Sequence, residues 1–274
     1  MKSPPRDDDL TRRLPADALR FDFGANWRDF LSGLTLDQID RATESVREML
    51  GLSTLEGAKF LDVGSGSGLF SLAARRLGAT VRSFDFDPGC VACAQYLRHR
   101  FDTDDLQWHI ERGSILDAAY VSGLGTYDVV YSWGVLHHTG NMGAAFEVIA
   151  RLVAPEGLLC ISIYNDQGLK SRYWRVVKQL YNRNRLLRGL MIVLHSPLLA
   201  RWYLMRLARG TLQPERGMSI WTDMKDWLGG YPFEVATPGQ VIEYFCDRGF
   251  ALVRVKDVGR GSGCNEFVFR RLPT

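Results

Sequence analysis

The sequence predicts an α/β fold, a doubly wound and mostly parallel sheet of seven strands with a Rossmann-like order, which carries a helical cap as an insertion. Three observations predict it. From residue 57 onward, short apolar runs alternate with helix-forming runs, the pattern of βαβ units. The run 157–164 is almost continuously apolar, as in a strand buried on both faces. A glycine-rich turn, 64–68, directly follows the first apolar run.

Composition limits the classes of protein. The chain has 274 residues, 46% of them hydrophobic and 24% charged, which is ordinary for a globular protein. A net charge of +3 is too small to indicate DNA or RNA by itself. Five cysteines, an odd number, and the lack of an apolar run after Met1 predict a cytoplasmic protein. Cys90 and Cys93 form a C-x-x-C pair, but no second pair lies nearby, so we expect no metal site.

The N-terminal part contains a disordered segment and a helical lid in our interpretation. Residues 1–20 are charged and proline-bearing, and we expect them to be disordered. Within the expected lid, 21–56, Thr35 and Gln38 form a capping box at the start of a helix. The aromatic stretch that ends at Trp27 needs a surface to lie on. Two interpretations stay open: a strut packed on the core, or a lid whose Trp27 contacts substrate.

The expected ligand-binding core, 57–164, begins with a strand, an acid and alternate glycines. Glycines let the backbone approach a ligand, and the helix that follows offers free N–H groups. The dinucleotide fingerprint needs a glycine at the sixth position, where this chain has Leu69. Asp62, just before the turn, would also repel a pyrophosphate. A nicotinamide dehydrogenase is therefore disfavoured, whereas a cationic ligand would tolerate the carboxylate.

The second predicted strand, 80–85, ends in an acid about 20 residues past the glycines. Asp85 is placed there to accept both hydroxyls of a ribose, with Phe86 beside it. We expect Asp87 to cap the helix that Pro88 begins.

The third and fourth predicted strands, 106–111 and 127–133, end in turns at the same edge of the sheet. These four elements in this order resemble class I S-adenosylmethionine-dependent methyltransferases over residues 56–164, in the small-molecule branch near the quinone and natural-product enzymes. The resemblance implies S-adenosylmethionine as cofactor and in-line transfer of its methyl group to O, N or C of a small or lipid-linked acceptor. It also implies the cofactor-binding set Asp62, Gly64, Ser65, Gly66, Gly68, Asp85, Phe86, Ser114, Ile115, Trp133 and Gly134.

Two adjacent histidines follow the fourth strand, where the ligand crevice of such a sheet lies. A general base helps when the acceptor is a hydroxyl, and we favour His138 over His137 for that role. The alternative, that both only shape the loop, stays open. Side chains expected to meet the acceptor are Trp27, Tyr164, Asn165, Trp221 and Tyr231.

An insertion, 165–233, interrupts the core, which 234–274 completes with a helix and a strand hairpin. We expect the apolar run 186–194 to stop at Pro197. The insertion holds four acids and many cations, namely Lys170, Arg172, Arg175, Lys178, Arg183, Arg185, Arg188, Arg201, Arg206, Arg209, Arg216 and Lys225. Three interpretations stay open: a helical cap with a solvated basic face, a cap that shapes the acceptor pocket, and an interfacial element meeting anionic lipid at the inner face of a membrane.

Two alternative functions remain: a cofactor-binding protein that transfers no methyl group, and a methyltransferase that acts on RNA through the basic cap. RNA is disfavoured because the cations alternate with large aliphatics rather than with stacking aromatics. DNA is not expected as a partner. Oligomeric state is not predicted.

Overall fold

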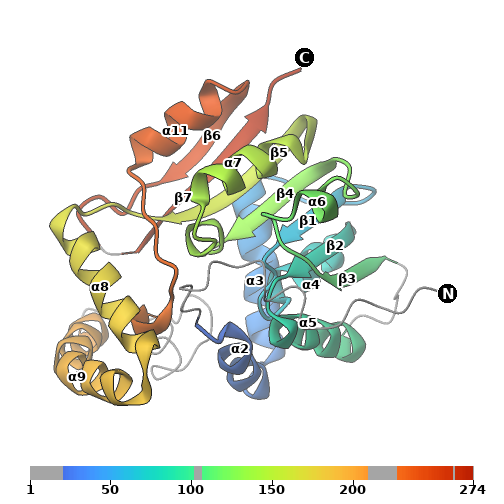
Figure 1. The fold of residues 1–274 in the computed structure, drawn as a ribbon. Helices are drawn as coiled ribbons and strands as arrows, with labels where there is room; N and C mark the ends of the chain where they lie inside the picture. Colours follow the sequence, from blue (N-terminus) through green and yellow to red (C-terminus); the bar gives the residue numbers. More distant parts are fainter. Residues whose placement is uncertain (1–20, 102–106, 209–226, 262, 274) are drawn as a thin grey trace.

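The computed structural model describes residues 21–101, 107–208, 227–261 and 263–273 (Figure 1). The expectations for 1–20 and for Trp221 lie outside these ranges. The elements of the sheet and of its flanking helices are α2 (Phe23–Ser32), α3 (Leu36–Leu50), β1 (Lys59–Val63), α4 (Leu69–Arg76), β2 (Thr80–Asp85), α5 (Pro88–Phe101), β3 (Trp108–Arg112), α6 (Ala118–Val121), β4 (Tyr127–Trp133), the 3-10 turn η1 (Leu136–His138), α7 (Met142–Arg151), β5 (Val153–Tyr164), α11 (Pro238–Cys246), β6 (Phe250–Lys256) and β7 (Cys264–Arg271). The insertion supplies α8 (Leu169–Arg183) and α9 (Arg185–Ala208).

The sheet has seven strands in the order β3-β2-β1-β4-β5-β7-β6. Strands β1 to β5 pair in parallel, whereas β7 lies antiparallel between β5 and β6. The predicted fold class and the final antiparallel strand are confirmed. Strand order reverses between β1 and β4, so a ligand crevice is expected at the carboxyl ends of these two strands.

Helices cover both faces of the sheet (Figure 1). On one face, α3, α4 and α5 pack over fully buried Phe60 and Trp108. On the other, α7 and α11 pack over Phe267 and Phe269 of β7, and α11 contributes its own buried ring, Phe245. Burial of such rings is the main stabilising term of the domain.

Capping boxes begin two of these helices, and the one at Thr35 is the box that the sequence predicts. Thr35 and Gln38 exchange side-chain-to-backbone hydrogen bonds at α3. Thr237 and Gln240 do the same at α11. Each box satisfies two N–H groups that a helix start otherwise leaves without acceptors.

Strand β5 begins earlier than predicted. The sequence places its start at residue 157, but pairing already starts at Val153, which lies opposite Tyr127. A register shift between Tyr127 and Val129 accommodates the extra residues, and Glu156 adopts a φ of 63°. The irregular stretch is a bulge within the strand rather than a connection before it.

Helix α9 continues through Pro197, although the apolar run 186–194 ends just before this residue. A proline cannot donate to the carbonyl four residues earlier, here that of Val193. The hydroxyl of Ser196 donates to this carbonyl instead, at 3.3 Å. The lost bond is thereby replaced, and the helix continues to Ala208.

Helices α8 and α9 lie side by side beyond the ends of β5 and β7 (Figure 1). They enclose a small apolar cluster of Val177, Tyr181, Met191 and Leu228. Among the helices in the described ranges, none combines the length and apolarity needed to cross a bilayer.

Candidate active site

A pocket of about 450 Å³ lies at the carboxyl ends of the parallel strands. Its walls come from the turns after β1, β2, β3 and β4, from the end of β5 and from α2. This volume falls in the range of small-molecule sites, and the place is the crevice expected where the strand order reverses.

The glycine turn after β1 forms one wall. Gly64 and Gly66 have positive φ values of 77° and 54°. A Cβ atom at Gly66 would lie 2.9 Å from Nε1 of Trp27, and one at Gly64 would meet the side chain of Val135. Side chains at these positions would therefore strain the backbone and also fill the pocket.

Two carboxyl groups lie at this turn, that of buried Asp62 and that of half-buried Asp85. Asp85 accepts hydrogen bonds from the backbone N–H groups of Gly66 and Asp87, both at 2.9 Å. Burial raises its pKa to about 6 against these bonds. Asp62 accepts from the hydroxyl of Ser71 at 2.6 Å, and burial, with a smaller contribution from Asp85, raises its pKa to about 7. Two carboxyl groups with pKa values near neutral pH suit a ligand that brings a positive charge and hydroxyl donors.

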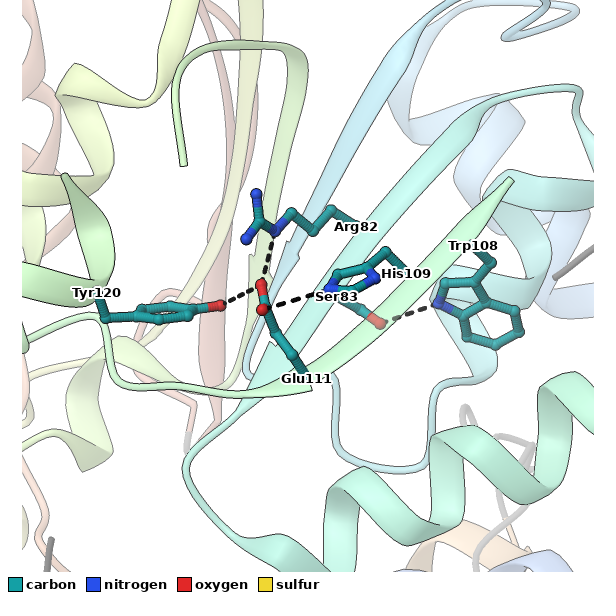
Figure 2. Close-up of polar contacts among 6 residues, drawn as sticks. All are labelled: Arg82, Ser83, Trp108, His109, Glu111 and Tyr120. Carbon is teal, nitrogen blue, oxygen red and sulfur yellow. Dashed lines mark hydrogen bonds and ion pairs between the residues drawn. The ribbon is translucent and has the colours of Figure 1, made fainter. Parts of the chain in front are cut away.

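A polar cluster supports the turn after β3 (Figure 2). The carboxylate of Glu111 accepts from Arg82 Nε at 2.6 Å and from the hydroxyl of Tyr120 at 2.8 Å. Burial acts to raise the pKa of Glu111, but the bonds from Arg82 and Tyr120 outweigh it and hold that pKa below its usual range. The ring of Tyr120 lies where a Cβ atom of Gly113 would be. Glu111 thus holds the ring of Tyr120 against Gly113, the residue before Ser114.

A side chain of β3, Trp108, also packs near the glycine turn. The indole of Trp108 donates to Ser83 Oγ at 2.9 Å, as Figure 2 shows. The same ring lies 3.5 Å from where a Cβ atom of Gly68 would be, and Ala94 lies closer still, at 2.8 Å. Gly68 therefore permits close packing of α4, and it does not line the pocket.

The N-terminal helix α2 is held against the pocket by Asp87. Its carboxylate accepts from the N–H of Gly24 at 2.8 Å and from the N–H of Gly89 at 2.7 Å. The predicted cap at the start of α5 is present, and the same group also binds the start of α2. A Cβ atom at Gly24 would lie 2.7 Å from Cα of Gly89, so the two helix ends touch. This contact places Trp27 over the glycine turn.

The two histidines have different hydrogen-bonding roles. Nδ1 of His138 lies 2.6 Å from the carbonyl oxygen of Pro232. A carbonyl only accepts, so Nδ1 carries the proton and Nε2 of neutral His138 carries the lone pair. His137 is fully buried, and its Nδ1 accepts from the N–H of Tyr164 at 3.3 Å. The lone pair of neutral His137 is thereby engaged with the backbone.

Aromatic rings surround His138. Its ring centroid lies 5.3 Å from that of Phe23 and 5.4 Å from that of Tyr164. Tyr164 in turn packs on Phe233, and Tyr231 completes the wall. The arrangement is an apolar enclosure with one imidazole facing it, which can bind a flat ring and exclude water.

The pocket brings together most of the residues that the sequence singles out, namely Trp27, Asp62, Gly64, Ser65, Gly66, Asp85, Phe86, Ser114, Ile115, Trp133, Gly134, His137, His138, Tyr164 and Tyr231. Asn165 is not among them, because its amide is bonded to Gly259 and Asn265. Within the described residues there is no group of three or more His, Cys, Asp or Glu side chains arranged to hold a metal ion.

Sequence reasoning missed two residues that hold the histidine loop. Pro232 orients the ring of His138, and the N–H of Glu234 donates to the carbonyl of His137 at 2.9 Å. The carboxylate of Glu234 also accepts from the N–H of Met142 at the start of α7, at 3.1 Å. No local pattern reveals these contacts, which join segments about 90 residues apart.

Three comparisons with known proteins bear on the family. The sequence model of a family described as a methyltransferase domain matches residues 36–236. A ubiquinone biosynthesis O-methyltransferase of Paracidovorax citrulli (strain AAC00-1) is 31% identical over 115 residues, which are 42% of this chain and 47% of that protein. The chain thus spans about half the length of the curated relatives it matches.

Two solved structures share the fold. Magnesium protoporphyrin IX methyltransferase (ChlM) from Synechocystis PCC 6803, with bound SAM, has a TM-score of 0.56 at 14% identity, over 98% of this chain and all of the other. The [4+2]-cyclase SpnF has a TM-score of 0.54 at 14% identity, over 86% of this chain and 81% of the other. The family match covers most of the chain, and the predicted resemblance is confirmed: this protein belongs to the methyltransferase family that has this domain.

Proposed function

We propose that the protein transfers the methyl group of S-adenosylmethionine to a small or lipid-linked acceptor. One observation carries the proposal: a single pocket joins the glycine turn and Asp85 on one side to the oriented ring of His138 on the other. Membership of the methyltransferase family supports it.

The residues after β1 and β2 would hold the donor. The carboxylate of Asp85 would accept the ribose hydroxyls, and Asp62 would favour the positive end of the molecule. Ser114 and Ile115 would border the adenine, while Trp133 and Gly134 would border the methyl group. When bound, the donor supplies an electrophilic methyl group on a sulfonium.

His138 would act as the general base for a hydroxyl acceptor. The carbonyl of Pro232 fixes the proton on Nδ1, so Nε2 is the nitrogen that takes the proton of the acceptor as its oxygen gains the methyl group. The proton ends on the imidazole, and the donor leaves as S-adenosylhomocysteine. His137 would position this ring through the contact between the two imidazoles, whose centroids are 4.4 Å apart.

The acceptor would be a flat, largely apolar ring that carries the group to be methylated. Phe23, Trp27, Tyr164 and Tyr231 supply the apolar surface against which such a ring stacks. The names of the similar proteins refer to ubiquinone biosynthesis and to magnesium protoporphyrin IX, and quinones and porphyrins are flat conjugated molecules. A lipid-linked acceptor agrees with the excess of cations in 165–233, and we propose that this cap makes peripheral contact with an anionic membrane.

The test is donor-dependent methylation. The protein is incubated with methyl-tritiated S-adenosylmethionine and with phenols, catechols and demethylated quinols of increasing tail length, and S-adenosylhomocysteine is measured. We expect product with at least one acceptor that carries a ring hydroxyl, and at subsaturating donor we expect Asp85→Ala to form less of it. Binding of donor without turnover on any of these classes, or tritium that enters only RNA, contradicts the proposal.

A second candidate is a reaction other than methyl transfer in the same pocket. The observation in its favour is the fold shared with a protein named as a [4+2]-cyclase. In that case the donor would be bound but would survive the reaction unchanged, which the same assay detects as product formation without S-adenosylhomocysteine.

A further inference from the structure

Helix α9 has an unusual distribution of side chains. Among the residues of α9 whose side chains the structure describes, Met191 and His195 are the most buried, and they pack toward α8. The opposite side is apolar as well. Leu186 is 87% exposed, Val193 68% and Leu204 61%, and Leu190 and Pro197 are also exposed.

These exposed residues form one stripe. At about 100° per residue, the spacings of 4, 7, 11 and 18 from the first member place all of them within about 60° of one another. We call this stripe, Leu186, Leu190, Val193, Pro197 and Leu204, the apolar face of α9. A helix on a domain surface normally turns polar residues outward, so an outward apolar face marks a surface that is covered by something else.

The charge around this face indicates what covers it. Helices α8 and α9 together contain no Asp and no Glu. Of the cations in these helices whose burial the structure describes, the exposed ones are Lys170, Arg172, Arg175, Arg183, Arg185, Arg188 and Arg201. On the helical wheel of α9, Arg185 and Arg201 flank the apolar face on its two sides. Leu169 and Val176 add exposed apolar area on α8.

A second copy of the chain does not fit this pattern. In a symmetric pair, the same patch would face itself, and cations would oppose cations. A bilayer with anionic headgroups meets both requirements, because acyl chains take up the apolar face and headgroups pair with the flanking arginines. We infer that α9 is an interfacial helix that docks the protein on an anionic membrane, with its apolar face inserted below the headgroups.

The inference goes beyond methyl transfer, since docking needs no turnover. Helix α8, against which α9 packs, follows β5 after a short connection, and β5 ends at Tyr164 in the pocket wall.

Vesicle flotation of the full chain tests the inference. Vesicles of phosphatidylcholine alone are compared with vesicles containing about a third of phosphatidylglycerol, at low salt. The test variant is the triple substitution Leu186→Gln, Leu190→Gln, Val193→Gln. The matched control is Leu36→Gln, Tyr96→Gln, Val253→Gln, which changes three other exposed apolar residues, all outside the cap.

We expect the unchanged protein and the control to float with the anionic vesicles, with partition at least tenfold above that on the neutral ones. The triple variant should lose at least tenfold, and Arg172→Glu with Arg185→Glu should lose binding to anionic vesicles. Thermal melting checks that each variant is folded. Failure to float on anionic vesicles, equal flotation of the triple variant, or a concentration-dependent dimer that the triple variant abolishes would overturn the inference.

Discussion

The imidazole of His138 is hydrogen-bonded through Nδ1 to the carbonyl oxygen of Pro232, 94 residues further along the chain, at 2.6 Å. Pro232 lies in the segment that returns from the cap, next to Tyr231 in the pocket wall. The cap and the histidine loop are therefore joined at the group proposed as the base. One hydrogen bond fixes both the ring and its tautomer.

Replacing His138 should reduce turnover without weakening the binding of the methyl donor. In His138→Gln the amide can still donate to Pro232, but the side chain can no longer take a proton. We expect kcat to fall about 10²–10⁴-fold, the usual contribution of a general base. The dissociation constant for S-adenosylhomocysteine should stay within about twofold. The control is His99→Gln on the exposed side of α5, which should leave both values unchanged.

Replacing Asp85 should weaken donor binding. Asp85→Ala removes the carboxylate proposed for the ribose, and loss of such charge-assisted bonds costs about 1.5–3 kcal/mol, or roughly ten- to a hundredfold in affinity. Isothermal titration with S-adenosylhomocysteine measures it. Asp37→Ala, at an exposed carboxylate of α3 paired with Arg41, is the control. Equal affinity in the two variants would remove Asp85 from the site.

Donor affinity should rise with pH between about 5 and 7.5. Burial raises the pKa of Asp85 to about 6 and that of Asp62 to about 7, so the ligand-free fold retains protons that the unfolded chain releases near pH 4. Burial of these groups therefore lowers the free energy of unfolding of the ligand-free protein as pH rises through this window. A cationic ligand stabilises the carboxylates and expels these protons. Affinity that is flat, or that increases on acidification, would contradict this linkage.

Removing Asp87 should loosen the attachment of α2 to α5. In Asp87→Ala the N–H groups of Gly24 and Gly89, at the starts of α2 and α5, both lose their side-chain acceptor. We therefore expect the free energy of unfolding to fall by about 1–2 kcal/mol. S-adenosylhomocysteine should also dissociate faster, because Trp27 is no longer held over the glycine turn. Asp117→Ala removes the cap of α6, away from α2, and should leave the dissociation rate unchanged. Stopped-flow tryptophan fluorescence measures the rate.

A side chain at Gly113 should disturb the turn after β3. In Gly113→Ala the new Cβ atom meets the ring of Tyr120, which must move away from Glu111. We expect donor affinity to fall about tenfold or more. At Gly123 the nearest atom to a new Cβ lies 3.6 Å away, so Gly123→Ala should bind normally. Normal binding by both variants would show that the cluster in Figure 2 does not position the turn.

Local chemistry explains why much of the core is predictable. The capping boxes at Thr35 and Thr237 lie within four residues, so the sequence displays them directly. The glycines and Asp85 follow strand ends, and parallel strands gather their carboxyl ends at one edge. The pocket residues there follow from the order of the elements alone.

The remaining contacts depend on packing between distant segments. Pro232 and Glu234 reach the histidine loop only because the cap returns to it, and no spacing in the chain encodes this return. Asn165 follows the strand whose end lines the pocket, yet its amide is bonded away from the pocket by Gly259 and Asn265. Helix α9 continues through Pro197, and the hydroxyl of Ser196 donates to the carbonyl of Val193, which the proline cannot do. The expectation that a proline ends a helix does not take such a side-chain hydrogen bond into account.

Isothermal titration of the unmodified protein tests the central claim most directly. S-adenosylmethionine and S-adenosylhomocysteine are titrated in turn, with NADH as the competing nucleotide. The account predicts one binding site for each sulfur nucleoside and no heat with NADH. Tight binding of NADH with no heat from either sulfur nucleoside would contradict it.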